Sequence, residues 1–374
     1  MRILRVAQNL YPAHPGGGAY HIHALSRDQA AMGHDVTVVT LSDDPDRPRE
    51  ETRDGYRVVR RRPRAELIGN QFAPGVWRDL RDGDYDLVHA HSHLYVSTNL
   101  AALWRVLDDR PLALTNHGLY SQSAPEWAFG PYLRTLGRWT FDRADVVFCY
   151  TDADRRRLRD LGVDAPVAVV PNGIDVEQFC PTGPIHGAMP TDGPVVLVPG
   201  RLVEGKNPGD ALEAVLQVRE SGVPARLVFC GDGPRRASLE ARVAATGDES
   251  AVSFLGRVPY DEMPAVYRGA DLLCLPSRAE GFPRSLLEAF ASGVPAVTSA
   301  LPQLRPVVPA AGRTVPLGDV GAMADHLEAL LADPGRRVRL GRRGRTLVTE
   351  RFRWTDTVEG TTDRLAELTT GPRR

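Results

Sequence analysis

The sequence predicts an α/β protein built of two doubly wound domains, each with a parallel sheet covered by helices on both faces. Three observations indicate this fold class. The chain has 374 residues, more than one ordinary hydrophobic core accommodates. Short runs rich in Val, Ile and Leu alternate with helical patterns, as expected for strands of a buried parallel sheet. A stretch dense in Pro, Gly and Asp, residues 171–193, separates these runs into two sets and is interpreted as a linker.

The first domain, residues 1–170, is predicted from six apolar runs bounded by turn residues. The opening run is followed by three glycines and by a helical pattern from His21 to a GHDV turn at Gly33. The stretch VVRRRPRAE, residues 58–66, is interpreted as a solvated edge or loop because of its arginines. The six runs are ILRVAQNL (3–10), DVTVVTL (35–41), YDLVHAHS (85–92), LALTNHG (112–118), DVVFCYT (145–151) and VAVVPNGID (167–175).

The second domain, residues 194–353, is predicted from five further runs of the same kind. A helical pattern at residues 354–368 follows it and could pack back onto the first domain. In open sheets of this kind, ligands bind beyond the carboxyl ends of the strands, so chemistry is expected in the loops after the runs. The five runs are PVVLVPG (194–200), ARLVFCGDG (225–233), VSFLGRV (252–258), DLLCLPS (271–277) and PAVTS (295–299).

Composition narrows the class of partner. The 46 basic and 47 acidic residues nearly cancel, so there is no global electrostatic reason to expect nucleic acid. The four cysteines lie far apart, which suggests neither a disulfide framework nor a zinc site and fits a reducing cytoplasm. No apolar run approaches the length of a membrane span, so membrane contact is expected to be peripheral at most, at the inner face of the membrane.

The first candidate site is the glycine triplet Gly16, Gly17 and Gly18 after the first strand. Glycines let a backbone approach a phosphate closely, and the following helix offers free N–H groups. The dinucleotide fingerprint GxGxxG would need glycine where His21 stands, and no acidic residue ends the next strand, so a nicotinamide dehydrogenase is not supported. A simple glycine turn explains the triplet equally well.

The second candidate site is the loop GRLVEGKNP, residues 200–208, after the first strand of the second domain. It holds Arg201 and Lys206, and Lys206 is the only lysine among the 46 basic residues of the chain. Two cations in one loop at the carboxyl end of a strand suit a diphosphate. A solvated surface pair is the alternative.

The third candidate site is SRAEGFPRSLLEAFASGVPAVTS, residues 277–299, in which Glu280 and Glu288 lie eight positions apart. Glu288 falls inside a helix expected to begin near Ser285. Its ordinary explanation is a capping box, in which Ser285 and Glu288 satisfy the first free N–H groups. A helix start of this kind also exposes its remaining donors to an anion.

These motifs together resemble glycosyltransferase family 4, the retaining group with the two-domain, Rossmann-like GT-B fold. The resemblance rests on the glycines near the N-terminus, the GRL…K loop, the Gly-Asp-Gly of CGDGP, and EGFPRSLLEAFASGVPAV, and it covers nearly the whole chain. It implies a hexosyltransferase that uses a nucleotide diphosphate sugar as donor substrate, needs no cofactor, and transfers the sugar to a hydroxyl acceptor. Glycolipid, polyprenol-linked, polysaccharide and small glycoside acceptors all fit.

The resemblance also implies roles for individual residues. The donor diphosphate would be bound by Arg201 and Lys206, which we also count as catalytic residues. Other diphosphate contacts would come from Gly16 or Gly17 and from the backbone at Ser285 and Leu286. Glu288 would hold the ribose hydroxyls and the backbone at Val258 would contact the base. The sugar would be contacted by Glu280 and His117, which we also count as catalytic.

The expected mechanism is same-face attack that retains the α configuration, with the leaving phosphate accepting the acceptor's proton. Two alternatives remain open: a GT-B sugar-nucleotide epimerase and a catalytically silent nucleotide-binding partner. No essential metal is expected. Of two Asp-x-Asp pairs, Asp84 with Asp86 precedes a strand, and Asp152 with Asp154 is typical of a helix cap.

Two further patterns have open interpretations. The alternating His89, His91 and His93 could share one face of a strand, but no carboxylate or cysteine completes a zinc set. The segment at residues 125–145 mixes aromatic residues with arginines, which suits either an anionic membrane surface near a lipid-linked acceptor or burial against the first domain.

Overall fold

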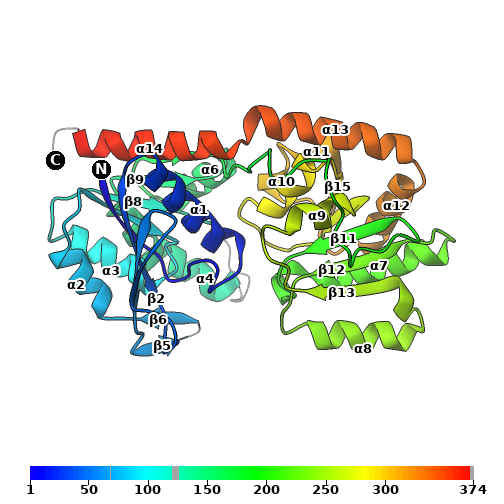
Figure 1. The fold of residues 1–374 in the computed structure, drawn as a ribbon, viewed down its shortest axis with the longest axis horizontal. Coiled ribbons are helices and arrows are strands. Elements are labelled where there is room, and N and C mark those ends of the chain that lie inside the picture. Colours follow the sequence, from blue (N-terminus) through cyan, green and yellow to red (C-terminus); the bar gives the residue numbers. More distant parts are fainter. Residues whose placement is uncertain (68, 120–125, 371–374) are drawn as a thin grey trace. The chain divides into compact units, whose positions relative to one another are not determined.

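The computed structural model describes residues 1–67, 69–119 and 126–370, and these fall into two compact units (Figure 1). The first unit comprises Met1–Leu119, residues 126–171 and residues 356–370, and the second comprises Asn172–Thr355. Residues 172–193, interpreted from the sequence as a linker, thus cluster with the second unit. Each unit is built on its own sheet, which is the doubly wound α/β architecture expected from the alternating runs.

The sheet of the first unit has the order β10-β9-β8-β7-β1-β2-β4-β3. Neighbouring strands are parallel except the edge pair β3 and β4, which is antiparallel. A separate antiparallel hairpin is formed by β5 and β6. The strands are β1 (Arg2–Val6), β2 (Asp35–Leu41), β3 (Glu50–Arg53), β4 (Tyr56–Arg61), β5 (Ala65–Leu67), β6 (Asn70–Phe72), β7 (Leu87–His91), β8 (Leu112–Thr115), β9 (Val146–Cys149) and β10 (Val167–Val169).

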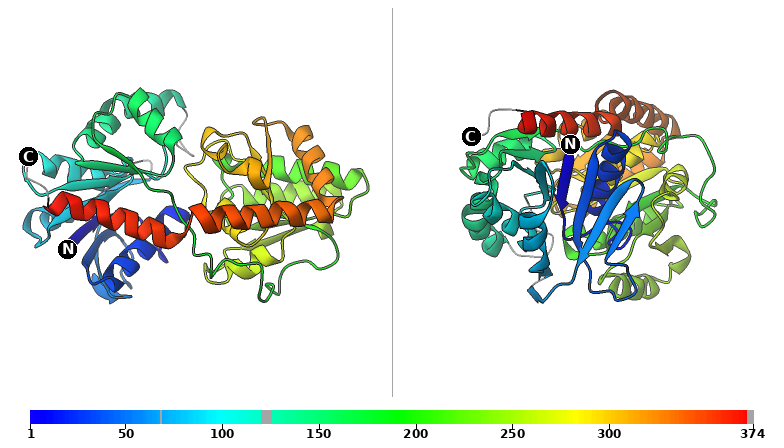
Figure 2. Two further views of the ribbon diagram at one scale, coloured as in Figure 1. Left: turned by 90° about the horizontal axis from the view of Figure 1, so that it is seen from above. Right: turned by 60° about the vertical axis from the view of Figure 1, so that its left-hand side comes forward.

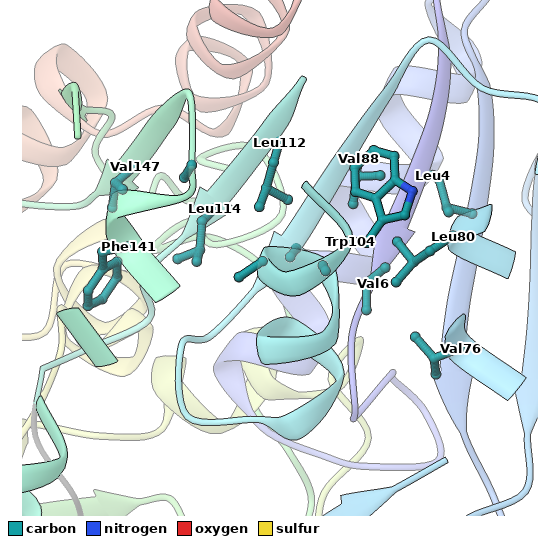
Figure 3. Close-up of a cluster of buried hydrophobic side chains, with 14 of the residues drawn as sticks. Leu4, Val6, Val76, Leu80, Val88, Trp104, Leu112, Leu114, Phe141 and Val147 are labelled. Atoms are coloured by element: carbon teal, nitrogen blue, oxygen red, sulfur yellow. The ribbon is translucent and has the colours of Figure 1, made fainter. Parts of the chain in front are cut away.

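Alternate residues of these strands enter two hydrophobic layers. On one face, Leu4, Val88 and Leu114 pack against α2, α3 and α5, with Leu80, Trp104 and Phe141 from the helices (Figure 3). On the other face, Ile3, Val38 and Leu87 pack against Ile22 of α1 and Leu365 of α14. The helices of this unit are α1 (Gly17–Ala31), α2 (Gly75–Asp82), α3 (Val96–Arg105), α4 (Glu126–Tyr132), the π-helix η1 (Leu133–Gly137), α5 (Arg138–Asp142), α6 (Asp152–Asp160) and α14 (Trp354–Thr370).

The C-terminal helix α14 runs along the same face of the first sheet as α1 (Figures 1 and 2). Besides Leu365, it contributes Thr362, whose hydroxyl accepts a hydrogen bond from the amide of Gln29 at 2.9 Å. Near its start, the Thr357 hydroxyl donates to the carbonyl of Pro171 at 2.8 Å. The last helix of the sequence is therefore part of the core built by the first residues.

The interpretation of residues 58–66 as a solvated edge or loop is wrong for residues 58–61, which belong to β4, but it holds for residues 62–66, which are mostly exposed. Val58 and Val59 are buried, and β4 lies inside the sheet between β2 and β3. The arginines that suggested solvent have acidic partners. Arg60 pairs with Glu51 at 2.6 Å, and Arg61 donates to Asp79 at 2.7 Å. Pairing removes much of the cost of placing these charges next to a core.

The second unit has an all-parallel sheet with the order β13-β12-β11-β14-β15-β16. One face packs against α7, α8 and α12, and helices α9 and α10 contribute the buried Val266 and Phe290. The strands are β11 (Val195–Pro199), β12 (Arg226–Cys230), β13 (Val252–Gly256), β14 (Leu272–Leu275), β15 (Ala296–Ser299) and β16 (Gly312–Val315). The helices are the 3-10 turns η2 (Glu204–Lys206), η3 (Glu249–Ala251) and η4 (Pro302–Leu304), with α7 (Pro208–Glu220), α8 (Arg236–Thr246), α9 (Met263–Arg268), α10 (Arg284–Ala291), α11 (Val308–Ala311), α12 (Val320–Leu331) and α13 (Pro334–Arg351).

Two segments at the ends of the second unit lie side by side. Ile174, near the start of the unit, forms a parallel bridge with Arg353, near its end. Ile174 N donates to Phe352 O at 2.8 Å, and Trp354 N donates to Ile174 O at 3.0 Å. Within the described ranges, the chain therefore enters this unit after residue 171 and leaves it after residue 355 at one hydrogen-bonded place.

Candidate functional site

In the second unit, the loops after β11 and β12 are joined along their length. Gly200 N donates to Cys230 O at 2.9 Å, and Leu202 N donates to Asp232 O at 3.0 Å. The Gly-Asp-Gly sequence is required for this close approach. A Cβ on Gly231 would lie 2.0 Å from the carbonyl oxygen of Gly200, and one on Gly233 would lie 2.5 Å from that of Leu202. The two loops thus form one rigid support for Arg201 and Lys206.

Lys206 and Glu280 meet at the carboxyl end of the second sheet, although 74 positions separate them. The loop after β14 reaches the loop after β11 through Arg278 N, which donates to Gly205 O at 2.9 Å. Lys206 Nζ donates to Glu280 Oε1 at 2.6 Å, and the Glu280 side chain is 6% exposed. The backbone carbonyl of Glu280 is fixed by the side-chain amide of Gln303. A buried carboxylate and a half-buried ammonium are therefore held together in this site.

Arg201 and Val258 occupy the same end of the unit. Arg201 is exposed and follows Gly200, and a Cβ built on Gly200 would lie 3.9 Å from Lys206 Nζ. Val258 is half-buried in the loop after β13, two residues before Tyr260.

The start of α10 differs from the capping box suggested by the sequence. The helix begins at Arg284, its N-cap is Pro283, and no side chain caps it. Ser285 is therefore the second helical residue and is half-buried, while the Leu286 N–H already donates to Pro283 O at 3.2 Å. Pro283, with an extended backbone, thus takes the N-cap place expected for serine.

Glu288 is buried and has side-chain partners of its own. Its two oxygens accept hydrogen bonds from the hydroxyls of Tyr260 at 2.9 Å and Tyr267 at 2.8 Å. Arg284 Nε lies 3.7 Å from Glu288 Oε1, one helical turn away. Burial raises the pKa of Glu288, and Arg284 and the two tyrosines oppose that rise. The capping-box explanation is thus wrong for both Ser285 and Glu288.

A separate hollow of about 350 Å³ adjoins the start of α7. Its charged groups are acids and arginines that pair with one another, such as Arg235 with Glu204 at 3.3 Å and Arg278 with Glu204 at 3.6 Å. Neither Lys206 nor Glu280 lines it. We therefore distinguish this hollow from the site formed by the loops after β11 and β14.

In the first unit, the glycine triplet and His117 lie next to each other. Gly16 is the N-cap of α1 with φ of 147°, a conformation that favours glycine, and Gly17 is the first helical residue. A Cβ on Gly18 would lie 3.5 Å from His117 Nδ1. The third glycine of the triplet thus faces the histidine that follows β8, whereas a Cβ on Gly16 would meet no atom within 4 Å.

Both ring nitrogens of His117 have partners within the first unit. Nδ1 lies 2.7 Å from the hydroxyl of Tyr150, and Nε2 lies 3.1 Å from His91 Nδ1. Burial lowers the pKa of His117 to about 4 and that of His91 well below its usual value. Both imidazoles are therefore neutral at pH 7, suited to hydrogen bonding rather than to charge pairing.

The three alternating histidines do not form one cluster. His89 and His91 share a face of β7, with ring centroids 4.4 Å apart, but His89 Nε2 lies 2.7 Å from the Thr115 hydroxyl. His93 lies beyond the strand, and its ring packs against that of Phe141 with the two ring centroids 4.7 Å apart. Within the described ranges, no group of three or more His, Cys, Asp or Glu residues is arranged to hold a metal.

The Asp-x-Asp pairs have structural partners. Asp84 and Asp86 both pair with Arg2. Thr151 is the N-cap of α6, and its hydroxyl donates to Asp154 Oδ2 at 2.7 Å and accepts from Asp154 N at 3.1 Å. The predicted helix cap is thus formed by Thr151 with Asp154, while Asp152 pairs with Arg155 at 2.7 Å.

Residues 126–142 of the aromatic segment form α4, η1 and α5. Phe129 and Phe141 are buried in the core, with Tyr132 and Trp139 packed against it. The side chain of Trp127 lies outside the described residues. Burial against the first unit therefore accounts for these four aromatic residues. In the part of the chain that the structure describes, no helix is long and apolar enough to span a bilayer.

The structure brings Lys206 and Glu280 into contact and places Ser285, Leu286 and Glu288 on one helix, whereas Gly16, Gly17 and His117 lie in the first unit. Sequence reasoning missed the partners of Glu288 and His117. The Arg284 and Glu288 pair has the (i, i+4) spacing of an ion pair on a helix, which was a usable signal. The missed residues are Tyr260, Tyr267, Arg284, Tyr150 and Gln303.

Solved structures with the same fold place the chain in a class. Sucrose-phosphate synthase from Thermosynechococcus elongatus matches with a TM-score of 0.82 and 22% identity, covering 98% of this chain and 99% of that one. Anabaena HepE in complex with UDP-glucose matches with a TM-score of 0.81 and 20% identity, covering 98% and 100%. The fold is therefore that of the GT-B glycosyltransferases.

Sequence relatives and family models make the assignment specific. The model described as Glycosyltransferase Family 4 matches residues 15–178, and that described as Glycosyl transferases group 1 matches residues 186–347. The phosphatidyl-myo-inositol mannosyltransferase of Mycobacterium leprae is 31% identical over 91% of this chain and 90% of its own. A glycogen synthase of Mycobacterium tuberculosis is 28% identical over 95% and 92%. The chain belongs to glycosyltransferase family 4 and is a hexosyltransferase.

Proposed function

We propose that this enzyme is a retaining, metal-independent glycosyltransferase. It transfers a hexose from a nucleoside diphosphate sugar to a hydroxyl acceptor. The observation that supports this most is the contact between Lys206 and the buried Glu280 at the carboxyl end of the second sheet, next to the uncapped start of α10. A cation, a hydrogen-bond acceptor for sugar hydroxyls and free helix N–H groups are what a sugar diphosphate requires.

In this proposal, Arg201 and Lys206 bind the diphosphate together with the Ser285 amide. The Leu286 amide has a weaker claim, because it already has a partner. As the glycosidic bond breaks, negative charge grows on the departing phosphate, and fixed cations stabilise it. Glu280 holds sugar hydroxyls, Glu288 the ribose and the Val258 backbone the base. The roles of Gly16, Gly17 and His117 toward the donor stay predictions.

The relatives suggest the first donors and acceptors to test. One is named as a GDP-mannose-dependent mannosyltransferase acting on a phosphatidylinositol monomannoside, and it is 28% identical over 98% of this chain. Others are named as D-inositol 3-phosphate glycosyltransferases, at 30% identity over 95% of the chain for that of Xylanimonas cellulosilytica. The proposal therefore includes inositol-bearing and lipid-linked hydroxyl acceptors as well as glycans. Peripheral membrane contact would accompany a lipid acceptor.

The test is a thermal-shift panel of UDP, GDP and ADP sugars, followed by product analysis with the donor that binds. A ligand that favours the folded state raises the melting temperature. NMR of the product should show the α configuration from an α-linked donor, and EDTA should leave the rate unchanged. Inversion, or loss of activity in chelator, would contradict the proposal. A product formed from the donor alone, by change of its sugar, would indicate the epimerase, and donor binding without turnover would indicate the silent partner.

A further inference from the structure

The hydroxyl of Tyr260 connects Glu288 to a buried arginine. Arg284 Nη2 donates to the Tyr260 hydroxyl at 2.8 Å, and that hydroxyl donates to Glu288 Oε1 at 2.9 Å. The guanidinium also lies over the Tyr260 ring, 5.8 Å from its centroid. Arg284 and Glu288 are both buried, while Tyr260 is half-buried. Through hydrogen bonds the three side chains form a series in which each orients the next, because the direct separation of 3.7 Å between Arg284 Nε and Glu288 Oε1 is too long for a hydrogen bond.

The same guanidinium contacts both segments where the chain enters and leaves the second unit. Its Nη1 donates to Gly173 O at 3.1 Å and lies 3.3 Å from Asn172 Oδ1. On the other side, the guanidinium lies 5.4 Å from the centroid of the Trp354 ring. The segments around Asn172 and Trp354 are themselves hydrogen-bonded through Ile174. Arg284 therefore joins this entry and exit point to the carboxylate of Glu288.

We infer that Arg284 is a positioning residue that acts through Tyr260 to orient the Glu288 carboxylate for the donor's ribose, and that couples this contact to the entry and exit segments. The inference rests on the proposed function of Glu288. It assigns no contact with substrate to Arg284 itself.

The chemistry of the two end groups supports this role. A buried carboxylate is costly unless it is hydrogen-bonded or paired, so the orientation of Glu288 depends on the few groups around it. Arginine has a planar fork that can bond carbonyls on one edge and a hydroxyl on the other while stacking on an aromatic ring. A ribose hydroxyl that binds Glu288 must share or replace the Tyr260 hydroxyl. Nucleotide binding would therefore change the contacts that the Arg284 guanidinium makes with the Gly173 carbonyl and the Trp354 ring.

The test compares nucleotides with and without the ribose 2′-hydroxyl. Affinities of the best-bound nucleoside diphosphate and its 2′-deoxy form would be measured by calorimetry for wild type, Tyr260→Phe, Arg284→Met and the double variant. Wild type should prefer the ribonucleotide by ~10-fold or more, since a hydrogen bond to a charged group is lost in the deoxy form. Each single variant should reduce that preference to about threefold or less, and the double variant should match the singles because the groups act in series.

A matched control and a second readout separate positioning from general damage. Arg345→Met also removes an arginine that bonds two backbone carbonyls, those of Phe179 and Ala291, but Arg345 makes no contact with Glu288 among the described interactions. It should keep the ribose preference. By hydrogen exchange, nucleotide should change the protection of the Ile174 and Trp354 amides in wild type and not in Arg284→Met.

The outcomes are distinguishable. If wild type does not prefer the ribonucleotide, the role of Glu288 in the proposed function is wrong and the inference is wrong with it. If wild type discriminates and both single variants retain the preference, only the inference about Arg284 is wrong. Additive losses in the double variant would show that Arg284 and Tyr260 act separately, which also contradicts it.

Discussion

In the proposed function, the chemistry of the site depends most on Lys206. Every other basic side chain of the protein is an arginine. Lys206 Nζ lies against Gly200 and donates to the buried Glu280, where there is room for a compact ammonium. A guanidinium is broader and planar, so we expect an arginine at this position to disturb the contact with Glu280.

Lys206→Arg should lower kcat by more than tenfold, equivalent to ~1.4 kcal/mol of activation free energy. The charge is kept but its position beside the diphosphate is lost. Steady-state kinetics with the preferred donor tests this expectation. Arg342→Lys, on the exposed face of α13, serves as the control and should leave kcat unchanged. Equal kinetics for Lys206→Arg and wild type would make the lone lysine an accident of composition.

Glu280→Gln should separate binding of the nucleotide from turnover of the sugar. Removing the carboxylate frees Lys206 from its partner and removes a negative charge next to the diphosphate, so a sugar-free nucleoside diphosphate should bind about threefold more tightly. Turnover of the sugar nucleotide should fall by about 10² because the charged acceptor for sugar hydroxyls is gone. Calorimetry and kinetics on one preparation measure both. Weaker binding together with unchanged turnover would contradict these roles.

At the scale of elements, the loops after β11 and β12 show why the Gly-Asp-Gly sequence is needed. The two loops exchange backbone hydrogen bonds and leave no room for a Cβ at Gly231 or Gly233. The support of Arg201 and Lys206 is therefore backbone against backbone. Its rigidity follows from the absence of side chains at these two positions.

Gly233→Ala should destabilise the second unit by about 1–3 kcal/mol, because the new methyl group overlaps the backbone of Leu202. Gly209→Ala is the matched control. Its Cβ would meet no atom within 4 Å, and alanine favours the helix that Gly209 helps to begin. The control should therefore be neutral or stabilising by up to ~1 kcal/mol. Urea denaturation compares the two, and equal stabilities would show that the loop adjusts without cost.

The elements that sequence could predict are those with continuous apolar runs. All eleven runs quoted from the sequence contain a strand of the structure. The strand β4 was missed because its arginines suggested solvent, and their partners Glu51 and Asp79 come from other elements. The strand β16, with the sequence GRTV, has too few apolar residues to be recognised and is placed by its pairing with β15.

For the site, the sequence indicated which residues bear charge but not which of them meet. Lys206 and Glu280 come together because β11 and β14 are neighbours in the sheet, and strand order is not encoded in residue spacing. Tyr260 and Tyr267 were missed for a similar reason. Their hydroxyls could be assigned a partner only from the structure, in which α10 places the Glu288 carboxylate within hydrogen-bond distance of both.

At the scale of the whole molecule, buried histidines should make the first unit sensitive to acid. The first unit encloses several neutral histidines. Burial lowers the pKa of His117 to about 4 and that of His93 to about 3, and it lowers those of His89 and His91 well below the usual value. In the unfolded chain each of these imidazoles regains a pKa near 6.5.

The stability of the first unit should therefore fall as pH falls from 7 to 5. Below about pH 6.5 the unfolded state binds protons that the folded state excludes, so each such histidine lowers the unfolding free energy by up to ~1.4 kcal/mol per pH unit. Denaturant unfolding at several pH values measures the slope. The variant His93→Phe replaces the imidazole that packs against Phe129 and Phe141. It should lower the slope of unfolding free energy against pH by the contribution of one proton. A first unit whose stability does not change over this range would contradict the expectation.

The central claim is that the loops after β11 and β14 and the start of α10 form one diphosphate site. The most direct measurement is a crystal structure with the preferred nucleotide sugar bound. We expect the diphosphate oxygens at about 2.7–3.1 Å from Lys206 Nζ and from the Ser285 amide, with the ribose at Glu288. A diphosphate bound away from both Lys206 and Ser285 would contradict the account.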